Sequence, residues 1–311
     1  MLERPGALAG IGGTPLVRLS RLTTADDAEV WLKLEAANPT GSYKDRMALA
    51  MIEGAEQRGT LQPGQTVVEY TGGSTGSSLA LVCAVKGYPL RIVTSNAFAL
   101  EKLRTMAAFG ATLEIIDSPE GIHPGLIPAM RDRVTQIVAT EGGFATDQFN
   151  NRDALDGYRT IGDEILEQLD GQIHAACVYV GVGGCLLGLT GALRERWPTL
   201  QRIAVEPDES AVLSGDPPGV HRIEGGGVGF VPPHLVGETL DGIERVSTAD
   251  AVAMARTVAV TEGVWSGPSG GANLVAALRT ARRLGPGHRV VTVQPDSGLK
   301  YLAGDLYQGP A

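Results

Sequence analysis

The sequence has few cysteines and no long apolar run, and both shortages restrict what the protein can be. The 311 residues include three cysteines, Cys83, Cys177 and Cys185, and none forms a C-x-x-C pair. Disulfides and a structural zinc site are therefore not expected. No apolar stretch is long enough to cross a membrane, and the first five residues lack the basic and apolar regions of a signal peptide. These features predict a cytoplasmic protein that is not bound to a membrane.

Basic residues are also in the minority. Lysine and arginine number 26 against 35 aspartates and glutamates, which gives a net charge of −9. Without a basic stripe, nucleic acid is not an expected partner. The five histidines show no spacing typical of metal ligands, so no metal site is predicted. Hydrophobic residues make up 43% of the chain, enough for a sizeable core, and the length suits one large domain or two moderate ones.

Short apolar segments bounded by glycine or proline alternate with amphipathic segments, and this alternation predicts α/β layers with a mostly parallel sheet. The predicted strands are Val30–Glu35, Thr66–Tyr70, Leu90–Thr94, Thr112–Ile116, Ala175–Val180, Arg202–Glu206 and Arg289–Gln294. The predicted helices are Asp45–Gln57, Thr75–Lys86, Leu100–Phe109, Pro128–Thr140, Ala154–Leu169, Gly184–Arg196, Thr248–Glu262 and Gly270–Leu284. A long loop is expected over Ser214–Leu240.

Glycine is plentiful, with 42 residues, and one cluster is Gly181-Val182-Gly183-Gly184 between a predicted strand and a predicted helix. Glycines let the backbone approach a phosphate, and a helix N-terminus adds N–H donors and a favourable dipole. A tight turn would use the same residues, so the cluster alone leaves both interpretations open. No Gly-Lys-Ser/Thr follows, so it is not a P-loop.

Lys44 lies in Asn38-Pro39-Thr40-Gly41-Ser42-Tyr43-Lys44-Asp45-Arg46, where a turn leads into a predicted helix. A lysine in a sheltered site can form a Schiff base, although a helix-start lysine with Ser42 as cap would look the same. Thr71–Gly76 also joins a strand to a helix, and could hold a carboxylate or simply cap the helix. Together, a lysine and two anion-binding turns suit a phosphorylated aldehyde cofactor and a carboxylate substrate.

Taken in order, these segments resemble the cysteine synthase (O-acetylserine sulfhydrylase) and cystathionine β-synthase family of pyridoxal 5′-phosphate (PLP) enzymes, of fold type II. The resemblance spans almost the whole chain. Besides the motifs above, it is carried by Ile11–Leu19, Glu101–Arg104 with Gly110-Ala111, Asp147–Asn151, Val205–Pro207, Gly227–Phe230, Gly267–Gly270, Pro295–Gly298 and Tyr301-Leu302.

The resemblance implies a fold and an assembly. The fold would be α/β, with two domains built as three-layer open sheets that have helices on both faces. A smaller domain would comprise residues 35–148 and carry the substrate-carboxylate loop. A larger domain would comprise residues 1–34 and 149–311 and carry the PLP phosphate loop. A homodimer is expected.

The resemblance also implies roles for residues. Lys44 would carry PLP as an imine and act as acid and base on the substrate α-proton. The phosphate would be held by Gly181, Val182, Gly183, Gly184 and Cys185, and Ser269 would face the pyridine nitrogen. The substrate carboxylate would be bound by Thr71, Gly72, Gly73, Ser74, Thr75 and Gln148, with Ser74 also near the cofactor.

The implied reaction is PLP-dependent β-replacement on an activated serine, of the O-acetylserine or O-phosphoserine type, through an aminoacrylate. Ser269 favours loss of a β leaving group, because a neutral hydroxyl does not stabilise a protonated pyridinium as an aspartate would. Sulfide or another small nucleophile would then give cysteine or a related β-substituted alanine. The alternatives are β-elimination, as in serine/threonine dehydratases, and a PLP-binding scaffold protein with little catalysis.

Four residues depart from the family's usual pattern. Gly72 and Ser74 stand where a serine and an asparagine are usual, Cys185 replaces a threonine, and Tyr43 replaces a smaller aliphatic residue. The first two leave room near the cofactor or its substrate. A thiol is a weaker donor than a hydroxyl, so backbone N–H groups would carry most of the phosphate binding.

Overall fold

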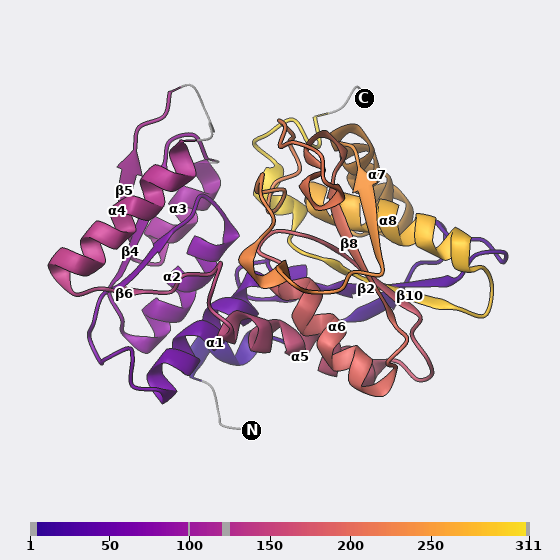
Figure 1. Ribbon diagram of the computed structural model, residues 1–311, viewed down its shortest axis with the longest axis horizontal. Coiled ribbons are helices and arrows are strands. Elements are labelled where there is room, and N and C mark those ends of the chain that lie inside the picture. The colour runs from indigo at the N-terminus through magenta and orange to yellow at the C-terminus, as the bar shows by residue number, and fades with distance from the viewer. Residues whose placement is uncertain (1–4, 99, 120–124, 309–311) are drawn as a thin grey trace. The chain divides into compact units, whose positions relative to one another are not determined.

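A computed structural model of the chain describes residues 5–98, 100–119 and 125–308. The described chain folds into two compact units, drawn in Figure 1. The first unit comprises residues up to Ile11 and Asn38–Gly157, and the second comprises Gly12–Ala37 and the residues from Tyr158 onward. Each unit contains its own sheet.

The first unit is built on a four-stranded sheet in which all the strands are parallel. Across the sheet, the strands are β5 (Thr112–Ile116), β4 (Leu90–Ser95), β3 (Val67–Tyr70) and β6 (Phe144–Ala145). The helices of this unit are α1 (Lys44–Gln57), α2 (Ser74–Lys86), α3 (Leu100–Ala108) and α4 (Leu126–Glu141).

Alternation along β3 places its side chains on the two faces of this sheet. Val68 and Tyr70 pack in one apolar cluster with Leu126 and Met130 of α4. Val67 and Glu69 point to the opposite face, on which α2 packs. Figure 1 shows α2 and α4 on different sides of the strands. The sheet is therefore covered on both faces. Glu69 is the one acidic residue of β3, which is one of the two central strands.

The second unit is built on a six-stranded sheet with one antiparallel edge strand, β1. Its order is β1 (Leu16–Arg18), β2 (Glu29–Leu34), β10 (Arg289–Gln294), β7 (Ala175–Tyr179), β8 (Gln201–Pro207) and β9 (Gly242–Val246). The remaining helices are α5 (Asp153–Gln168), which begins in the first unit, α6 (Gly184–Arg196), α7 (Thr248–Glu262) and α8 (Pro268–Leu284). Short 3-10 helices occupy Gly6–Gly10, Glu35–Ala37, Asp208–Ser210, Val212–Ser214, Pro233–Leu235 and Gly298–Tyr301.

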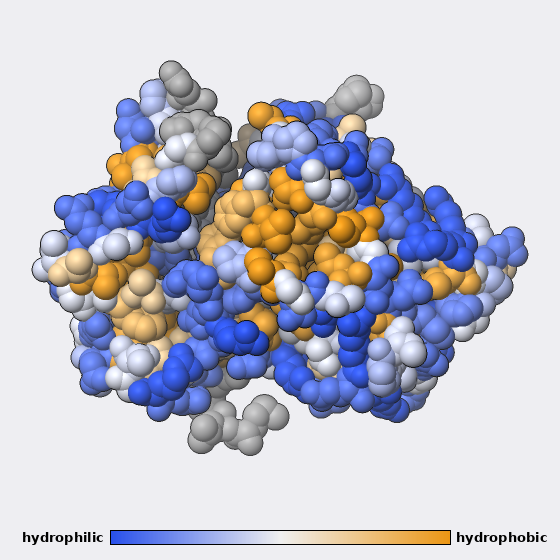
Figure 2. All heavy atoms as spheres, viewed as in Figure 1, coloured by the Kyte–Doolittle hydropathy of each residue, from blue (hydrophilic) through white to orange (hydrophobic). Residues whose placement is uncertain are grey.

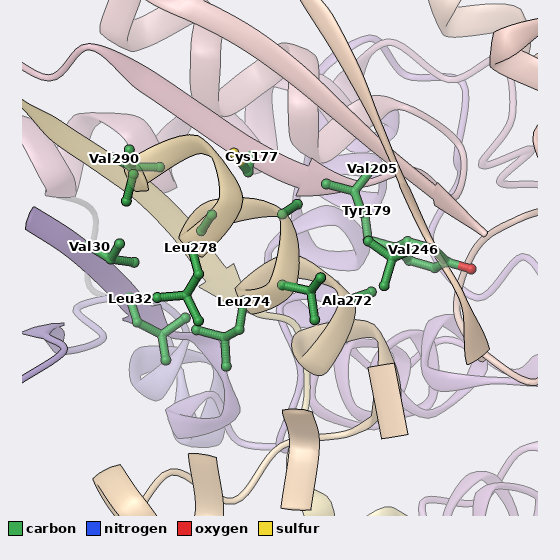
Figure 3. Close-up of a cluster of buried hydrophobic side chains, with 14 of the residues drawn as sticks. Val30, Leu32, Cys177, Tyr179, Val205, Val246, Ala272, Leu274, Leu278 and Val290 are labelled. Carbon is green, nitrogen blue, oxygen red and sulfur yellow. The ribbon is translucent and has the colours of Figure 1, made fainter. Parts of the chain in front are cut away.

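The main core of the second unit lies between the sheet and α8. Figure 3 shows Leu32 of β2 beside Leu274 and Leu278 of α8. Tyr179 of β7 belongs to the same cluster and lies beside Val205 and Val246. Leu32 and Leu274 are fully buried, and burying a leucine stabilises a fold by about 1.5–3 kcal/mol. This packing fixes the end of β7, where the Gly181–Gly184 turn begins, relative to the start of α8, where Ser269 lies.

The predicted α/β class with parallel sheets is confirmed, and so is each predicted strand and helix to within about two residues. Three short strands were not predicted, β1, β6 and β9. Helix α8 begins at Pro268, two residues before the predicted start, so Ser269 lies in the helix and not before it. In the part of the chain that the structure describes, no helix is both long and apolar enough to cross a bilayer.

Candidate functional site

Lys44 is the first residue of α1, as the turn before it predicts. Asp45 fixes that turn, because its carboxylate accepts hydrogen bonds from Thr40 N at 2.8 Å and Thr40 Oγ1 at 2.5 Å. Ser42 Oγ accepts a hydrogen bond from Lys44 N at 3.3 Å, although the N-cap of α1 is Tyr43 and not Ser42. The Lys44 side chain is buried, with Nζ 4.8 Å from the centre of the Tyr43 ring. An aromatic face at that distance attracts an ammonium group, so Tyr43 helps to hold Nζ in place.

The Thr71–Gly76 segment joins β3 to the amino end of α2. Thr71 Oγ1 accepts a hydrogen bond from Gly73 N at 3.1 Å, which fixes the turn. Gly73 is the N-cap of α2, and as a glycine it has no side chain with which to cap the helix. No acidic residue lies in the first turn. Backbone N–H groups and the helix dipole at this end favour an anion such as a carboxylate.

Thr75 and Gln148 are brought into contact, although they lie far apart in the sequence. Thr75 Oγ1 donates a hydrogen bond of 2.9 Å to Gln148 Oε1, and both side chains are buried. Because the amide oxygen accepts this bond, the donors of the Gln148 side chain are its amide N–H groups. Two residues that the sequence assigns to one substrate group therefore form a single polar pair at the start of α2.

Sequence reasoning missed Glu69, the buried acid two residues before Thr71. Its carboxylate accepts hydrogen bonds from Tyr70 N at 2.9 Å, Thr146 Oγ1 at 2.6 Å and Gln148 N at 3.2 Å. Burial raises the pKa of Glu69 to about 7, against the opposing effect of these hydrogen bonds. The signal in the sequence was a single charge inside an otherwise apolar strand.

Phe98 is the second residue near this loop that the sequence did not indicate. It lies between β4 and α3, and its ring packs directly on Gly72. An ideal Cβ on Gly72 would lie 2.1 Å from Phe98 Cγ. The space that opens at Gly72 is therefore filled by an aromatic ring from another part of the same unit.

In the second unit, the glycine turn after β7 forms a backbone cradle at the amino end of α6. An ideal Cβ on Gly181 would lie 2.6 Å from Gly225 O, and one on Gly183 would lie 2.8 Å from Leu235 Cγ. Gly183 has φ +86°, a left-handed conformation that favours glycine. The N-cap of α6 is Gly183, which has no side chain to cap the helix, and the first turn holds no acidic residue. These features fit a phosphate group held by backbone N–H donors.

Gly225 lies close to both parts of the second unit that the sequence assigns to the cofactor. Its carbonyl approaches Gly181, and an ideal Cβ on Gly225 would lie 4.0 Å from Ser269 Oγ. Ser269 is buried in the first turn of α8. Within the described chain its hydroxyl makes no hydrogen bond to protein, so a ring nitrogen of a ligand would suit it. A phosphate cradle and a hydroxyl around one glycine turn fit PLP.

The predicted site residues fall into two sets. Lys44, Thr71–Thr75 and Gln148 belong to the first unit, and Gly181–Cys185 with Ser269 belong to the second. Among the described residues, no group of three or more His, Cys, Asp or Glu side chains is placed to hold a metal ion. His123 lies outside those residues.

Comparison with known proteins gives a consistent match along the chain. Residues 7–296 match the family model described as "Pyridoxal-phosphate dependent enzyme". A cysteine synthase of Staphylococcus aureus is 40% identical over 299 residues, which cover 96% of this chain and 95% of that protein.

Two solved structures are also similar over nearly their full lengths. O-acetylserine sulfhydrylase isoform 3 of Entamoeba histolytica superposes with a TM-score of 0.92 at 34% identity, over 100% of this chain and 95% of that one. An O-acetylserine dependent cystathionine β-synthase of Helicobacter pylori gives 0.90 at 32% identity, over 99% and 100% of the two chains.

Proposed function

Because the chain belongs to the family of pyridoxal-phosphate dependent enzymes, we propose that it catalyses β-replacement on an activated serine, with O-acetylserine as donor and sulfide as nucleophile, and forms cysteine. The similarity to a cysteine synthase over 96% of the chain carries this choice of reaction. The Thr75–Gln148 pair beside the amino end of α2 supports an amino-acid substrate, because it offers donors to a carboxylate.

The cofactor would be held mainly by the second unit. Backbone N–H groups of Gly181–Cys185 would bind the phosphate, and the Ser269 hydroxyl would meet the ring nitrogen without adding a charge. Bound PLP supplies a conjugated electron sink for the α-carbon of an amino acid, which allows a β leaving group to depart. Since Ser269 is neutral, it would not stabilise a protonated ring nitrogen as an aspartate would, and this would favour departure of the β group.

Residues of the first unit would act on the amino acid. The amine of Lys44 would hold the cofactor covalently and move the proton at the substrate α-carbon. Gln148, Thr75 and backbone N–H groups at the amino end of α2 would bind the carboxylate and orient the α-carbon. The ring of Phe98 on Gly72 would exclude water from one side of this turn.

The experiment that tests this function is an assay of PLP-reconstituted protein with O-acetylserine, O-phosphoserine or serine, each with and without sulfide. We expect cysteine, detected by mass spectrometry, when O-acetylserine and sulfide are both present. Release of pyruvate without any nucleophile, at a rate equal to that with sulfide, would instead identify β-elimination. The same assays are repeated with homocysteine as a second nucleophile. If no donor gives a β-substituted alanine with either nucleophile, the proposal is overturned.

We further propose that the enzyme is a cytoplasmic homodimer that acts on small molecules. The Ser214–Leu240 loop of the second unit carries exposed apolar side chains, with Val220 92% and Val236 72% exposed. Figure 2 shows hydrophobic surface gathered on one face of this unit. Exposed apolar patches commonly mark protein interfaces. Light scattering should give twice the chain mass of 32.5 kDa, and a monomeric mass at micromolar concentration would contradict the dimer.

A further inference from the structure

Glu69 lies fully inside the first unit, and its side chain is 1% exposed. An ionised carboxylate in such a place is costly unless donors surround it. Three hydrogen-bond donors surround Glu69. Thr146 Oγ1 and Gln148 N donate to Oε2, and Tyr70 N donates to Oε1. Two of these three donors belong to the segment after β6, so the carboxylate ties that segment to β3.

The segment needs such a tie because its backbone turns sharply at Asp147. Asp147 has φ +47°, the single non-glycine residue with positive φ in the described chain, and this conformation costs free energy. Its carbonyl accepts hydrogen bonds from Asn150 N at 3.0 Å and Asn151 N at 2.9 Å. The hydrogen bonds that Glu69 accepts hold the residues immediately before and after Asp147, and so fix the direction of the backbone at Gln148.

Tyr70 reinforces this arrangement from the other face of β3. Its ring stacks on Phe149, with ring centres 6.1 Å apart and planes within 6° of parallel. Two neighbouring residues of β3, Glu69 and Tyr70, therefore hold the two central residues of the turn that begins at Asp147, Gln148 and Phe149. The side chain of Gln148 is then placed to accept the bond from Thr75 Oγ1.

We infer that Glu69 is a positioning residue for carboxylate binding: by holding the backbone of Gln148, it keeps the Gln148 amide paired with Thr75 at the amino end of α2. This inference rests on the proposed function for the identity of the ligand, an α-amino acid. A hydrophobic residue at position 69 would pack in the strand but would leave Gln148 N and Thr146 Oγ1 without their acceptor. Glu69 acts through Gln148 and does not contact the reacting atoms.

The test compares PLP-loaded wild-type protein with Glu69→Gln and Thr146→Val. In the first variant, an amide NH₂ replaces one of the two accepting oxygens. In the second, the hydroxyl donor is lost with little change in shape. Thr146→Ser keeps the hydroxyl and is the matched control. Each protein is assayed with O-acetylserine and sulfide, and titrated with L-alanine, which has an α-carboxylate but no β leaving group.

We expect the KM for O-acetylserine and the Kd for L-alanine to rise together by about 10- to 100-fold in Glu69→Gln, the loss typical of one hydrogen bond to a charged group. Thr146→Val should show a smaller rise in both constants. The KM for sulfide should stay unchanged because sulfide has no carboxylate, kcat should change by less than about threefold, and Thr146→Ser should match wild type.

An unchanged L-alanine Kd in folded Glu69→Gln would overturn the inference. A joint decrease of kcat, PLP content and melting temperature in Glu69→Gln would also overturn it, because that pattern marks a purely structural role. If Glu69→Gln does not fold, Thr146→Val and Thr146→Ser decide between these outcomes. If wild-type protein binds L-alanine but transforms no activated serine, the proposed function fails, and the L-alanine titrations still decide the role of Glu69.

Discussion

The ring of Phe98 occupies the space in which a side chain at position 72 would begin. An ideal Cβ on Gly72 would lie 2.1 Å from both Cγ and Cδ1 of Phe98 and 2.3 Å from Cδ2. Real Cβ contacts are never so short, and Cγ lies near the base of the side chain, so the whole ring would have to move. Gly72 and Phe98 are therefore a matched pair, and a serine at position 72 is incompatible with the present position of the ring.

This pair predicts the outcome of restoring the serine. Gly72→Ser alone should lower the melting temperature and reduce kcat/KM for O-acetylserine by about tenfold or more, because overpacking costs about 1–3 kcal/mol. Adding Phe98→Ala to the Gly72→Ser variant should remove the steric clash and recover most of the lost melting temperature and kcat/KM. A double-mutant cycle of melting temperatures and kcat/KM measures the coupling. Additive effects would mean that the ring does not constrain position 72.

Lys44→Ala should abolish cysteine formation, with a loss of at least about a thousandfold, because the amine that holds the cofactor and moves the α-proton is removed. The matched control is Lys86→Ala, at the end of α2, where the ammonium pairs with Glu56 at 2.7 Å. That variant should retain activity within about threefold, because Lys86 is not one of the predicted site residues.

A second readout for Lys44 does not depend on turnover. Borohydride reduction of wild-type protein, followed by digestion and mass spectrometry, should find PLP on the peptide that contains Lys44. The same treatment of Lys44→Ala should give no labelled peptide, while Lys86→Ala should match wild type. A PLP adduct on another lysine of the wild-type protein would overturn the assignment of Lys44.

Glu69 should make the free energy of unfolding depend on pH. Burial raises its pKa from 4.5 to about 7, so the folded state holds the proton more tightly than the unfolded state. The resulting stabilisation is fully present below pH 4.5 and is lost as the pH rises to about 7, by about 3 kcal/mol in all. The measurement is the free energy of unfolding in urea at a series of pH values for wild type and for Glu69→Gln. The loss should appear as a pH-dependent difference between the two free energies.

Thr146→Val tests the cause of that dependence. The Thr146 hydroxyl lowers the pKa of Glu69, so its removal should raise that pKa further and extend the loss of stability to higher pH. A difference between wild type and Glu69→Gln that stays constant from pH 4.5 to 8 would contradict a shifted Glu69.

The sequence predicted the regular elements well because most strands are buried on both faces and bounded by glycine or proline. β7 is buried at each of its five residues, and its apolar run is unmistakable. The strands that were missed lie at sheet edges. β6 has two residues, and β9 reads Gly-Ile-Glu-Arg-Val, in which one residue is buried. Edge strands need less apolar surface, so composition does not reveal them.

Some residues of the candidate site could also be predicted from the sequence, and others could not. The glycine turns and Lys44 could be located because each follows a strand and precedes a helix, and this local pattern is visible in one dimension. Glu69 and Phe98 could not be assigned a role, because their contacts with Gln148 and Gly72 depend on how β3, β6 and the loop after β4 fold together. The roles of the individual site residues and the domain boundaries at residues 35 and 148 stay predictions.

Cys185 should contribute little to cofactor binding, even though it lies in the first turn of α6. A thiol donates weakly, and the cradle of backbone N–H groups at Gly181–Gly184 would carry the phosphate. Cys185→Ala should therefore change the Kd for PLP by less than about threefold, whereas Cys185→Ser should lower it by about 3- to 10-fold, since a hydroxyl adds about 0.5–1.5 kcal/mol. Gly181→Ala is the control that should weaken binding strongly, because its Cβ would lie 2.6 Å from Gly225 O. Fluorescence titration with PLP measures the Kd of all three variants. A rise of more than tenfold in the Kd of Cys185→Ala would show that the thiol itself holds the phosphate.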